Sequence, residues 1–372
     1  MAAWQLPDDF RCPISLEIMT DPVILSSGHT FDRASIQRWL DSGHRTCPIT
    51  KLPLPKHPSL IPNHALRSLI SNFALSSLPP AKPHPPSFQQ DPHALVSTLT
   101  SRSSDIASKL DCLSRLVKLA KRDPASRRRL SESGTVSVVL RCIDSDDPVM
   151  QEKALSLVLN LSLDDDNKVG LVAEGAIGKI VAALRGNFAS CRALAATIIT
   201  SLAVVEVNKA LIGEYPFAIE SLIALLTDGN GREKKEAATA LFAICSFSDN
   251  RKRAVASGAV PILLSIADSG LERAVEVLGL LAKCKEGREV MARFNGTVRI
   301  LVRVLRTGGS KGVQYALLTL YSLCCYSGRM GVAVRKEGVL EDCWRLVEDE
   351  NEKIRRNASN LVQVLGGDCS MR

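Results

Sequence analysis

Residues Phe10 to Val23 read FRCPISLEIMTDPV, and the same Cys-Pro-Ile returns in HRTCPIT at His44 to Thr50. A cysteine beside a proline in two short loops is typical of small zinc modules. A structural zinc site normally has four ligands, however, usually in tight Cys-x-x-Cys or Cys-x-x-His pairs, and each loop here has one cysteine. What holds these loops must therefore be sought in the residues around them.

The residues that follow predict a small mixed fold. Residues 21–25 (DPVIL) and 28–31 (GHTF) predict two short strands with a turn between them. Residues 32–43 (DRASIQRWLDSG) predict a helix that begins after Asp32 as its N-cap. A second helix is expected to begin after Asn63, because apolar residues recur there at helical spacing.

A proline-rich segment divides the chain into two different parts. Residues 76–92 contain six prolines and no periodic apolar pattern, so they predict an extended spacer rather than a helix. We therefore predict an N-terminal domain at residues 4–77, a linker at 78–92 and helical repeats at 93–367.

The chain beyond the spacer repeats with a period near 41 residues. One set of markers is interpreted as the sharp turn between helices in each unit: Gly134, Gly175, Tyr215, Gly258, Gly296 and Gly338. A second set keeps the same rhythm and is interpreted as the ends of apolar helices: Asn167, Asn208, Asn250, Gly287 and Gly328. This period is typical of armadillo-type solenoids. We expect about six units, with divergent units at both ends.

The apolar pattern of each unit predicts helices that must pack against other helices. Residues 175–184 have apolar side chains three and four apart, which indicates one buried face. Residues 191–205 are apolar nearly all round, which indicates a helix packed on several sides. Since no unit can cover its own apolar face, the units must stack on one another.

The bulk composition excludes several classes of protein. Aromatic residues make up 4% of the 372 residues, and the net charge of +8 is spread in short clusters, which disfavours nucleic-acid binding. No run of 18 uncharged apolar residues occurs, and the N-terminus lacks a secretory pattern. We expect a cytoplasmic protein, with the nucleus or a peripheral membrane location left open, and eleven cysteines kept as thiols.

Three segments carry a resemblance to a known domain. The stretch LPDDFRCPISLEIMTDPVILSSGHTFDRASIQRWL, with TCPIT and LIPNHALRSLI after it, resembles the U-box of ubiquitin ligases over its full length. The order of U-box, spacer and repeats resembles the plant U-box family with armadillo repeats. The resemblance implies a mostly α-helical chain: a small RING-like, metal-free α+β U-box followed by a right-handed armadillo α-solenoid.

The resemblance also offers an answer to what holds the loops. In a U-box, polar contacts and apolar packing replace the zinc ions of a RING, so no metal is expected. Candidates for such contacts are Glu17, Asp21, Asp32 and Arg33, together with the Ser26-Ser27 pair. The alternative from the residues alone is a single zinc site made by Cys12, His29, His44 and Cys47.

The family's activity implies particular roles for loop residues. Members bind a ubiquitin-conjugating enzyme charged with ubiquitin, and a substrate lysine attacks the thioester directly, so neither a nucleophile nor a cofactor is expected. By motif, the docking anchors are Ile14, Trp39 and Pro48, and Lys51 is the nearest match to a basic residue that contacts both partners. Ile14 and Trp39 could instead be core residues, and Lys51 a solvated lysine.

The repeats are expected to recruit a protein substrate along their third helices. Asn160 lies where import receptors carry a ladder of asparagines, but its equivalents are Ser201 and Ala243, which argues against that function. Basic residues near helix starts would favour an acidic or phosphorylated ligand, and they could also be merely solvated: Arg192, Lys234, Lys235 and Arg273. A non-catalytic adaptor and an import or nucleic-acid-binding solenoid remain the alternatives to a ligase.

Overall fold

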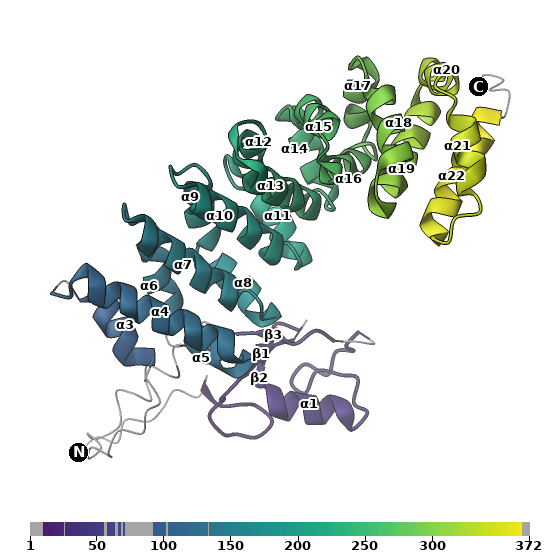
Figure 1. The fold of residues 1–372 in the computed structure, drawn as a ribbon. Helices are drawn as coiled ribbons and strands as arrows, with labels where there is room; N and C mark the ends of the chain where they lie inside the picture. Colours follow the sequence, from purple (N-terminus) through teal and green to yellow (C-terminus); the bar gives the residue numbers. More distant parts are fainter. Residues whose placement is uncertain are drawn as a thin grey trace, which may run out of the picture. The chain divides into compact units, whose positions relative to one another are not determined.

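The computed structural model describes residues 10–25, 27–55, 58–63, 66–67, 70, 92–101, 103–132 and 134–366. The chain divides into two compact units (Figure 1). The predicted contact of Ser26 and nearly all of the predicted linker at 78–92 lie outside the described residues.

Among its described residues, the N-terminal module contains a three-stranded antiparallel sheet and the helix α1, and residues 66–67 and 70, after Asn63, are also helical. The strands β1 (Pro22–Ile24), β2 (Thr30–Asp32) and β3 (Ile61–Pro62) lie in the order β2-β1-β3. The predicted helix is α1 (Arg33–Asp41), and its N-cap is Asp32 as expected. The strand β3 was not predicted, because two residues that include a proline carry no strand pattern of their own.

The core of this module draws on both loops, the sheet and α1. Its buried apolar residues are Phe10, Cys12, Met19, Val23, Leu25, Phe31, Ile36, Leu40, Cys47 and Ile70. Cys12 and Cys47 are fully buried, so each loop is packed into the module through its cysteine. The cysteines therefore act as small core residues, which the hydrophobic effect stabilises.

The rest of the described chain is helical, as its period predicts. Two helices come first, α3 (Pro92–Thr100) and α4 (Ile106–Arg122), and six groups of three follow among the described residues. The first helices of the groups are α5 (Pro124–Glu132), α8 (Asp165–Ala173), α11 (Glu206–Glu214), α14 (Ser248–Ala256), α17 (Lys285–Arg293) and α20 (Gly328–Lys336). The second helices are α6 (Thr135–Cys142), α9 (Ala176–Leu184), α12 (Ala218–Asp228), α15 (Ala259–Asp268), α18 (Thr297–Thr307) and α21 (Val339–Leu346). The third helices are α7 (Pro148–Leu161), α10 (Ala189–Leu202), α13 (Gly231–Ile244), α16 (Glu272–Leu281), α19 (Ser310–Tyr326) and α22 (Glu352–Gly366).

The third helices form the spine of the solenoid. They follow one another in Figure 1, and each packs against the third helix of the next group, as α10 does between α7 and α13. Seven of the fourteen residues of α10 are buried, including Ala195 and Ile198. This burial explains why the sequence of α10 is apolar on several sides.

The residue just before the second helix of each group has a left-handed backbone. This explains why the first set of sequence markers consists mainly of glycines. Gly175 and Gly258 have φ values of 85° and 80°, a backbone region that glycine adopts without a steric cost. In the third group the residue in this position is Phe217, with φ 64°, and not Tyr215. The sequence prediction was wrong by two residues there, because a phenylalanine gives no signal for a left-handed corner.

The second set of markers has a structural reason. Asn208 and Asn250 lie in the first turn of α11 and α14, and so begin helices rather than end them. The side-chain amide of Asn208 donates to the carbonyl of Leu202 (3.0 Å) and to that of Lys168 (3.3 Å) in the preceding group. Asn250 repeats this pattern one group later, with bonds to Ile244 (3.0 Å) and Lys209 (2.7 Å). The asparagines therefore satisfy the carbonyls of Leu202 and Ile244 at the ends of α10 and α13, and their second bonds, to Lys168 and Lys209, tie neighbouring groups together.

Candidate functional site

The first Cys-Pro-Ile loop is held closed by two backbone hydrogen bonds. The N–H of Cys12 donates to the carbonyl of Glu17 (2.7 Å), and the N–H of Leu16 donates back to the carbonyl of Cys12 (2.8 Å). Leu16 lies in the left-handed region with φ 58°. For a residue with a branched side chain this conformation costs about 1–2 kcal/mol, so the surrounding bonds must impose it.

The second loop repeats the geometry of the first. The N–H of Cys47 donates to the carbonyl of Leu52 (2.9 Å), and the N–H of Lys51 donates to the carbonyl of Cys47 (2.9 Å). Lys51 also has a φ of 58°. The two loops are therefore equivalent turns of fixed shape, although their sequences share only Cys-Pro-Ile.

Each cysteine sulfur accepts a hydrogen bond from a distant part of the module. The N–H of Asp32 donates to Sγ of Cys12 (3.3 Å), and the hydroxyl of Ser27 donates to Sγ of Cys47 (3.2 Å). Burial raises the pKa of the Cys47 thiol, but the bonds from Ser27, Thr50 and Ile49 outweigh it and lower the pKa to about 7. Burial likewise opposes a lowering of the Cys12 pKa that Ser15, Asp32 and Ile14 produce through hydrogen bonds. Each sulfur is thus surrounded by donors.

Asp32 connects the first loop to the sheet and the helix. Its Oδ2 accepts bonds from the N–H of Thr20 (2.8 Å), the hydroxyl of Thr20 (3.1 Å) and the N–H of Asp21 (3.0 Å). Its Oδ1 accepts from the N–H of Ala34 at the start of α1 (3.2 Å). One carboxylate therefore satisfies four donors from two segments, which fixes their relative position.

The other predicted polar contacts have different outcomes. Asp21 accepts a bond from Nε of Arg33 (2.7 Å) and forms a further ion pair with Arg67. Glu17 is exposed, and within the described residues its carboxylate has no hydrogen bond or ion pair. Glu17 takes part only through its main-chain carbonyl, because its side chain lies on the outer side of the turn.

The residues of the alternative zinc site have other contacts. Within the described part of the chain, no three His, Cys, Asp or Glu side chains gather as metal ligands. Nδ1 of His44 lies 3.0 Å from the Ser42 hydroxyl, and the His44 ring stacks on Trp39, with ring centres 3.9 Å apart. Cys12, His29, His44 and Cys47 therefore do not form one cluster.

Trp39 links α1 to the second loop. Its indole N–H donates to the carbonyl of Thr46 (2.9 Å), and the ammonium of Lys51 lies 5.8 Å from its ring centre. The same ammonium donates to the carbonyl of Pro48 (2.8 Å). Trp39 is half-buried and packs against the core, so it supports the loop as well as presenting an edge to solvent.

Apolar side chains lie on the surface of both loops. Ile14 and Pro48 are half-buried, and Ile14 packs against the core of the module. Leu16, Ile49 and Leu52 are more exposed, at 70%, 44% and 60%. These three were missed in the sequence, although an apolar residue in a short polar turn is itself a signal. Together the five side chains give the loops an apolar outer surface.

The predicted groove residues of the solenoid are partly occupied by internal contacts. Nε of Arg192 lies 2.6 Å from the carboxylate of Glu233, and Arg273 pairs with Glu276 at 2.5 Å. Both glutamates are buried, so these pairs belong to the packing of α10, α13 and α16. Asn160 is buried and donates to the carbonyl of Ser156 (2.6 Å). Among the described contacts, Lys234 and Lys235 have no side-chain partner.

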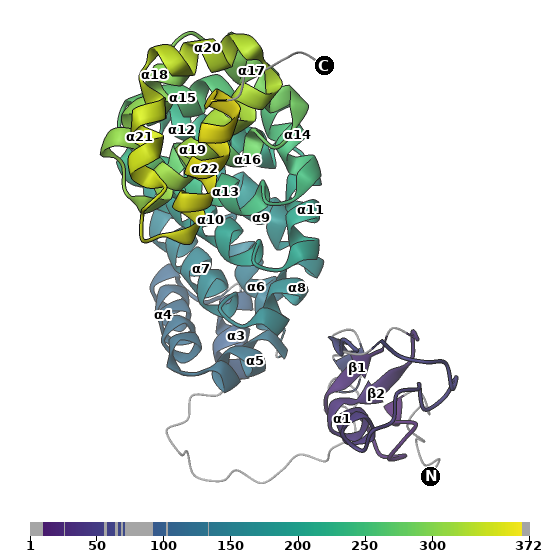
Figure 2. The ribbon, with the colours of Figure 1, turned by 90° about the vertical axis from the view of Figure 1, so that its right-hand side faces the viewer.

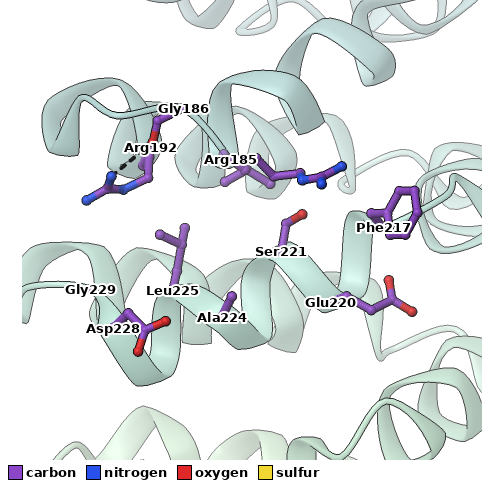
Figure 3. Close-up of a pocket in the computed structure, with 11 residues that line it drawn as sticks. Arg185, Gly186, Arg192, Phe217, Glu220, Ser221, Ala224, Leu225, Asp228 and Gly229 are labelled. Carbon is purple, nitrogen blue, oxygen red and sulfur yellow. Dashed lines mark hydrogen bonds between the residues drawn. The ribbon is translucent and has the colours of Figure 1, made fainter.

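A separate hollow lies between α9 and α12 (Figure 3). It has a volume of about 460 Å³ and is lined by the end of α9, the start of α10 and one face of α12. The Arg185 guanidinium points toward the Phe217 ring, 4.9 Å from its centre (Figure 3). This contact stabilises the ring of a residue whose backbone is left-handed.

These features define a class of protein: a RING-like module with hydrogen-bonded cysteines, followed by armadillo repeats. The model of the U-box domain matches residues 6–77, and that of the plant U-box protein ARM repeat region matches residues 94–371. The chain is 62% identical to U-box domain-containing protein 8 of Arabidopsis thaliana, over 98% of both chains. It is 34% identical to U-box domain-containing protein 1 of Medicago truncatula, over 100% of this chain and 58% of that one.

Solved structures support the solenoid fold. A crystal structure of an engineered protein covers 74% of this chain with a TM-score of 0.66 and 21% identity. A β-catenin structure, from work on its interaction with cadherin, covers 82% of this chain with a TM-score of 0.65 and 14% identity. The chain belongs to the plant U-box proteins with armadillo repeats. U-box proteins are generally E3 ubiquitin ligases.

Proposed function

We propose that this chain is a U-box ubiquitin ligase that binds a ubiquitin-charged conjugating enzyme on the outer surface of its two loops. The observation that carries the proposal is the identical closure of the loops around Cys12 and Cys47, with Ile14 and Pro48 half-exposed beside them. A rigid apolar surface suits docking, because a few well-placed anchors dominate small interfaces and little entropy is lost on binding.

The proposed mechanism is positioning. The substrate lysine attacks the ubiquitin thioester on the conjugating enzyme, and no side chain of this protein forms a covalent intermediate. Holding the two reactants together can lower the barrier by several kcal/mol. Trp39 and Thr46 contribute by fixing the second loop against α1 through their 2.9 Å hydrogen bond.

We further propose that Lys51 contacts the bound enzyme and its ubiquitin. In the free protein its ammonium is bound to the Pro48 carbonyl at the edge of the loop, where it is exposed. A lysine offers one compact charge and not the planar fork of arginine. Replacing Lys51 with arginine should therefore retain or increase the rate of chain formation, whereas replacing it with glutamate should lower the rate.

Substrate recruitment is assigned to the repeats. Because Arg192 and Arg273 already have buried carboxylate partners, Lys234 and Lys235 are the stronger candidates for an acidic or phosphorylated ligand. Proximity labelling with the Lys234→Glu, Lys235→Glu double variant should lose partners that Lys285→Glu, a change of an exposed lysine on α17, retains. Loss of the same partners in both variants would argue against these lysines. The same labelling, done in cells, also tests the predicted cytoplasmic location.

The decisive experiment is an autoubiquitination assay with a panel of conjugating enzymes. The wild type should build chains with at least one of them, and Ile14→Ala should slow this about tenfold, the effect expected of one lost anchor worth about 1.4 kcal/mol. Ile61→Ala is the matched control, since Ile61 is an exposed isoleucine of β3. If the wild type is inactive with every enzyme, or if both variants lose equal activity, the proposal is wrong.

A further inference from the structure

The helix α11 carries an apolar stripe on its outer side. The stripe begins with Val204 just before the helix, continues with Val207 and Leu211 inside it, and ends with Tyr215 just after it. These side chains are exposed at 66%, 54%, 43% and 41%. Val207 and Leu211 are four residues apart within α11, so they share one side of the helix. Val204 and Tyr215 flank them at its two ends. Large apolar side chains gathered on one exposed face are uncommon in a monomer and often mark an interaction site.

The equivalent positions in neighbouring groups are not apolar in this way. Counted from the starts of α8 and α14, they are Leu163, Asp166, Gly170 and Glu174 in the group before, and Ser246, Asp249, Arg253 and Ser257 in the group after. Neighbouring groups therefore stack without such a stripe. The stripe on α11 is not required by the repeat fold.

The two first helices on either side of α11 differ in charge. The first turn of α8 and its N-cap are acidic, with Asp164, Asp165 and Asp166 in a row, whereas α14 carries Arg251, Lys252 and Arg253. The helix α20 has three basic residues and no acidic one. Figure 2 shows α8, α11 and α14 in succession along one side of the solenoid. The apolar stripe is thus flanked by an acidic helix and a basic helix.

We propose that the α11 stripe binds a second copy of this chain, with the two-fold axis parallel to α11. Such an axis places α11 against α11 of the second copy. It also places the acidic α8 of each copy opposite the basic α14 of the other. A two-fold axis across the helices would instead bring like charges together. Self-complementarity about a two-fold axis is what an isologous dimer requires.

Other occupants fit the same surface less well. An anionic membrane would attract α14 but repel the carboxylates of α8. Within the described residues no single helix is long and apolar enough to cross a membrane, and α11 meets that test only jointly with α12, across a bend of 79°. A foreign apolar helix would leave the opposite charges of the two flanks unused.

The size of the stripe sets the strength of the dimer. A stable interface buries roughly 800 Å² on each partner, more than four side chains supply, so the flanks on α8 and α14 must take part. We expect association in the micromolar range, about 8 kcal/mol. This inference is independent of the proposed ligase activity, because it concerns α11 and not the U-box loops.

A cysteine cross-link tests the predicted axis. Since a residue on the axis meets its own copy, Val207→Cys in a Cys325→Ser, Cys369→Ser background should form a dimer disulfide quantitatively under a mild copper–phenanthroline oxidant. Val332→Cys in the same background is the control, because Val332 is an equally exposed valine of α20, at 51%. Cross-linking of both variants alike, or of neither, would overturn the proposal.

Sedimentation of the full-length chain tests the chemistry of the interface. Leu211→Glu should weaken association at least tenfold. Lys252→Glu and Asp166→Lys should each weaken it, and the two changes together should restore it, because the opposite charges then face each other again. A wild type that remains monomeric at about 100 μM, or a dimer that Leu211→Glu leaves unchanged, contradicts the proposal.

Discussion

The main-chain N–H of Asp32 donates a hydrogen bond to Sγ of Cys12, which lies 3.3 Å away and twenty residues earlier in the chain. The contact joins the end of β2 to the first loop. The sulfur here accepts a hydrogen bond from a main-chain N–H. The carboxylate of the same aspartate then satisfies donors of Thr20 and Asp21.

Replacing Asp32 with alanine should destabilise the U-box by about 2–3 kcal/mol. The N–H groups of Thr20 and Asp21 would lose their acceptor, and α1 would lose its N-cap. Hydrogen exchange of residues 20–34, followed by mass spectrometry, measures the loss. Glu17→Ala is the control and should leave exchange unchanged, since that side chain is exposed. Equal effects of the two changes would show that Asp32 has no special role.

The stability of the U-box should rise with pH between about 7 and 9. The pKa of Cys47 is lowered from 9.0 to about 7 in the folded protein, so the folded state binds this proton more weakly than the unfolded state. The stabilisation is fully present above the unfolded pKa and disappears as the pH falls through about 7. Hydrogen-exchange profiles at several pH values should show this rise of stability with pH in the wild type, and Cys47→Ala should abolish the rise. The same pH dependence of stability in both proteins would rule the prediction out.

Removal of metal should not affect this protein. If hydrogen bonds hold both loops, dialysis against a chelator should leave autoubiquitination and thermal unfolding as they were. A genuine RING ligase treated alongside should lose its activity. Elemental analysis that finds stoichiometric zinc in the purified chain would refute the account of the loops given above.

The left-handed corners should tolerate only glycine without a cost. Gly175→Ala should destabilise the solenoid by about 1 kcal/mol, because φ is 85° and no atom lies within 4 Å of the added Cβ, which leaves backbone strain as the cause. Gly331→Ala is the counterpart, since this glycine lies inside α20 with equally open space and a helical backbone. It should stabilise the chain by about 0.5–1 kcal/mol. Urea midpoints of both variants check the opposite signs.

Asn250→Ala should cost about 2 kcal/mol or more, because it strands the carbonyls of Lys209 and Ile244. Asn295→Ala provides the comparison, as Asn295 is exposed at the turn before α18, and its change should stay within about 0.5 kcal/mol. Thermal unfolding followed by circular dichroism distinguishes them. A neutral Asn250→Ala would mean that water replaces the amide.

Much of the fold was predictable because its causes are local or periodic. Asp32 was identified as an N-cap from its place before an apolar helix pattern, and Gly175 as a corner from its recurrence. Phe217 was missed, since its left-handed backbone is imposed by the packing of α11 and α12 and not by its own preference. The strand β3 was missed for the same reason: its two residues become a strand only through pairing with Val23 and Ile24.

The candidate site was predictable only in part. The resemblance to the U-box motif predicted Ile14, Pro48 and Lys51 as docking residues, and in the structure they lie on two equivalent loops. Their binding to a conjugating enzyme stays a prediction. The basic residues of the groove show the limit most clearly. Arg192 resembled Lys234 in sequence, and only the fold gives Arg192 a buried partner in Glu233, forty-one residues later.

The sequence by itself determined the two Cys-Pro-Ile loops, the helix caps and a solenoid with a period near 41 residues, because these are properties of short segments, and its resemblance to known proteins indicated the U-box. Only the tertiary structure determined which polar groups meet: Asp32 with Thr20, Ser27 with Cys47, and Asn250 with Lys209. It alone left the apolar side of α11 uncovered. The physical reason is that a hydrogen bond or a buried surface depends on distances between residues far apart in the chain, which no local pattern encodes.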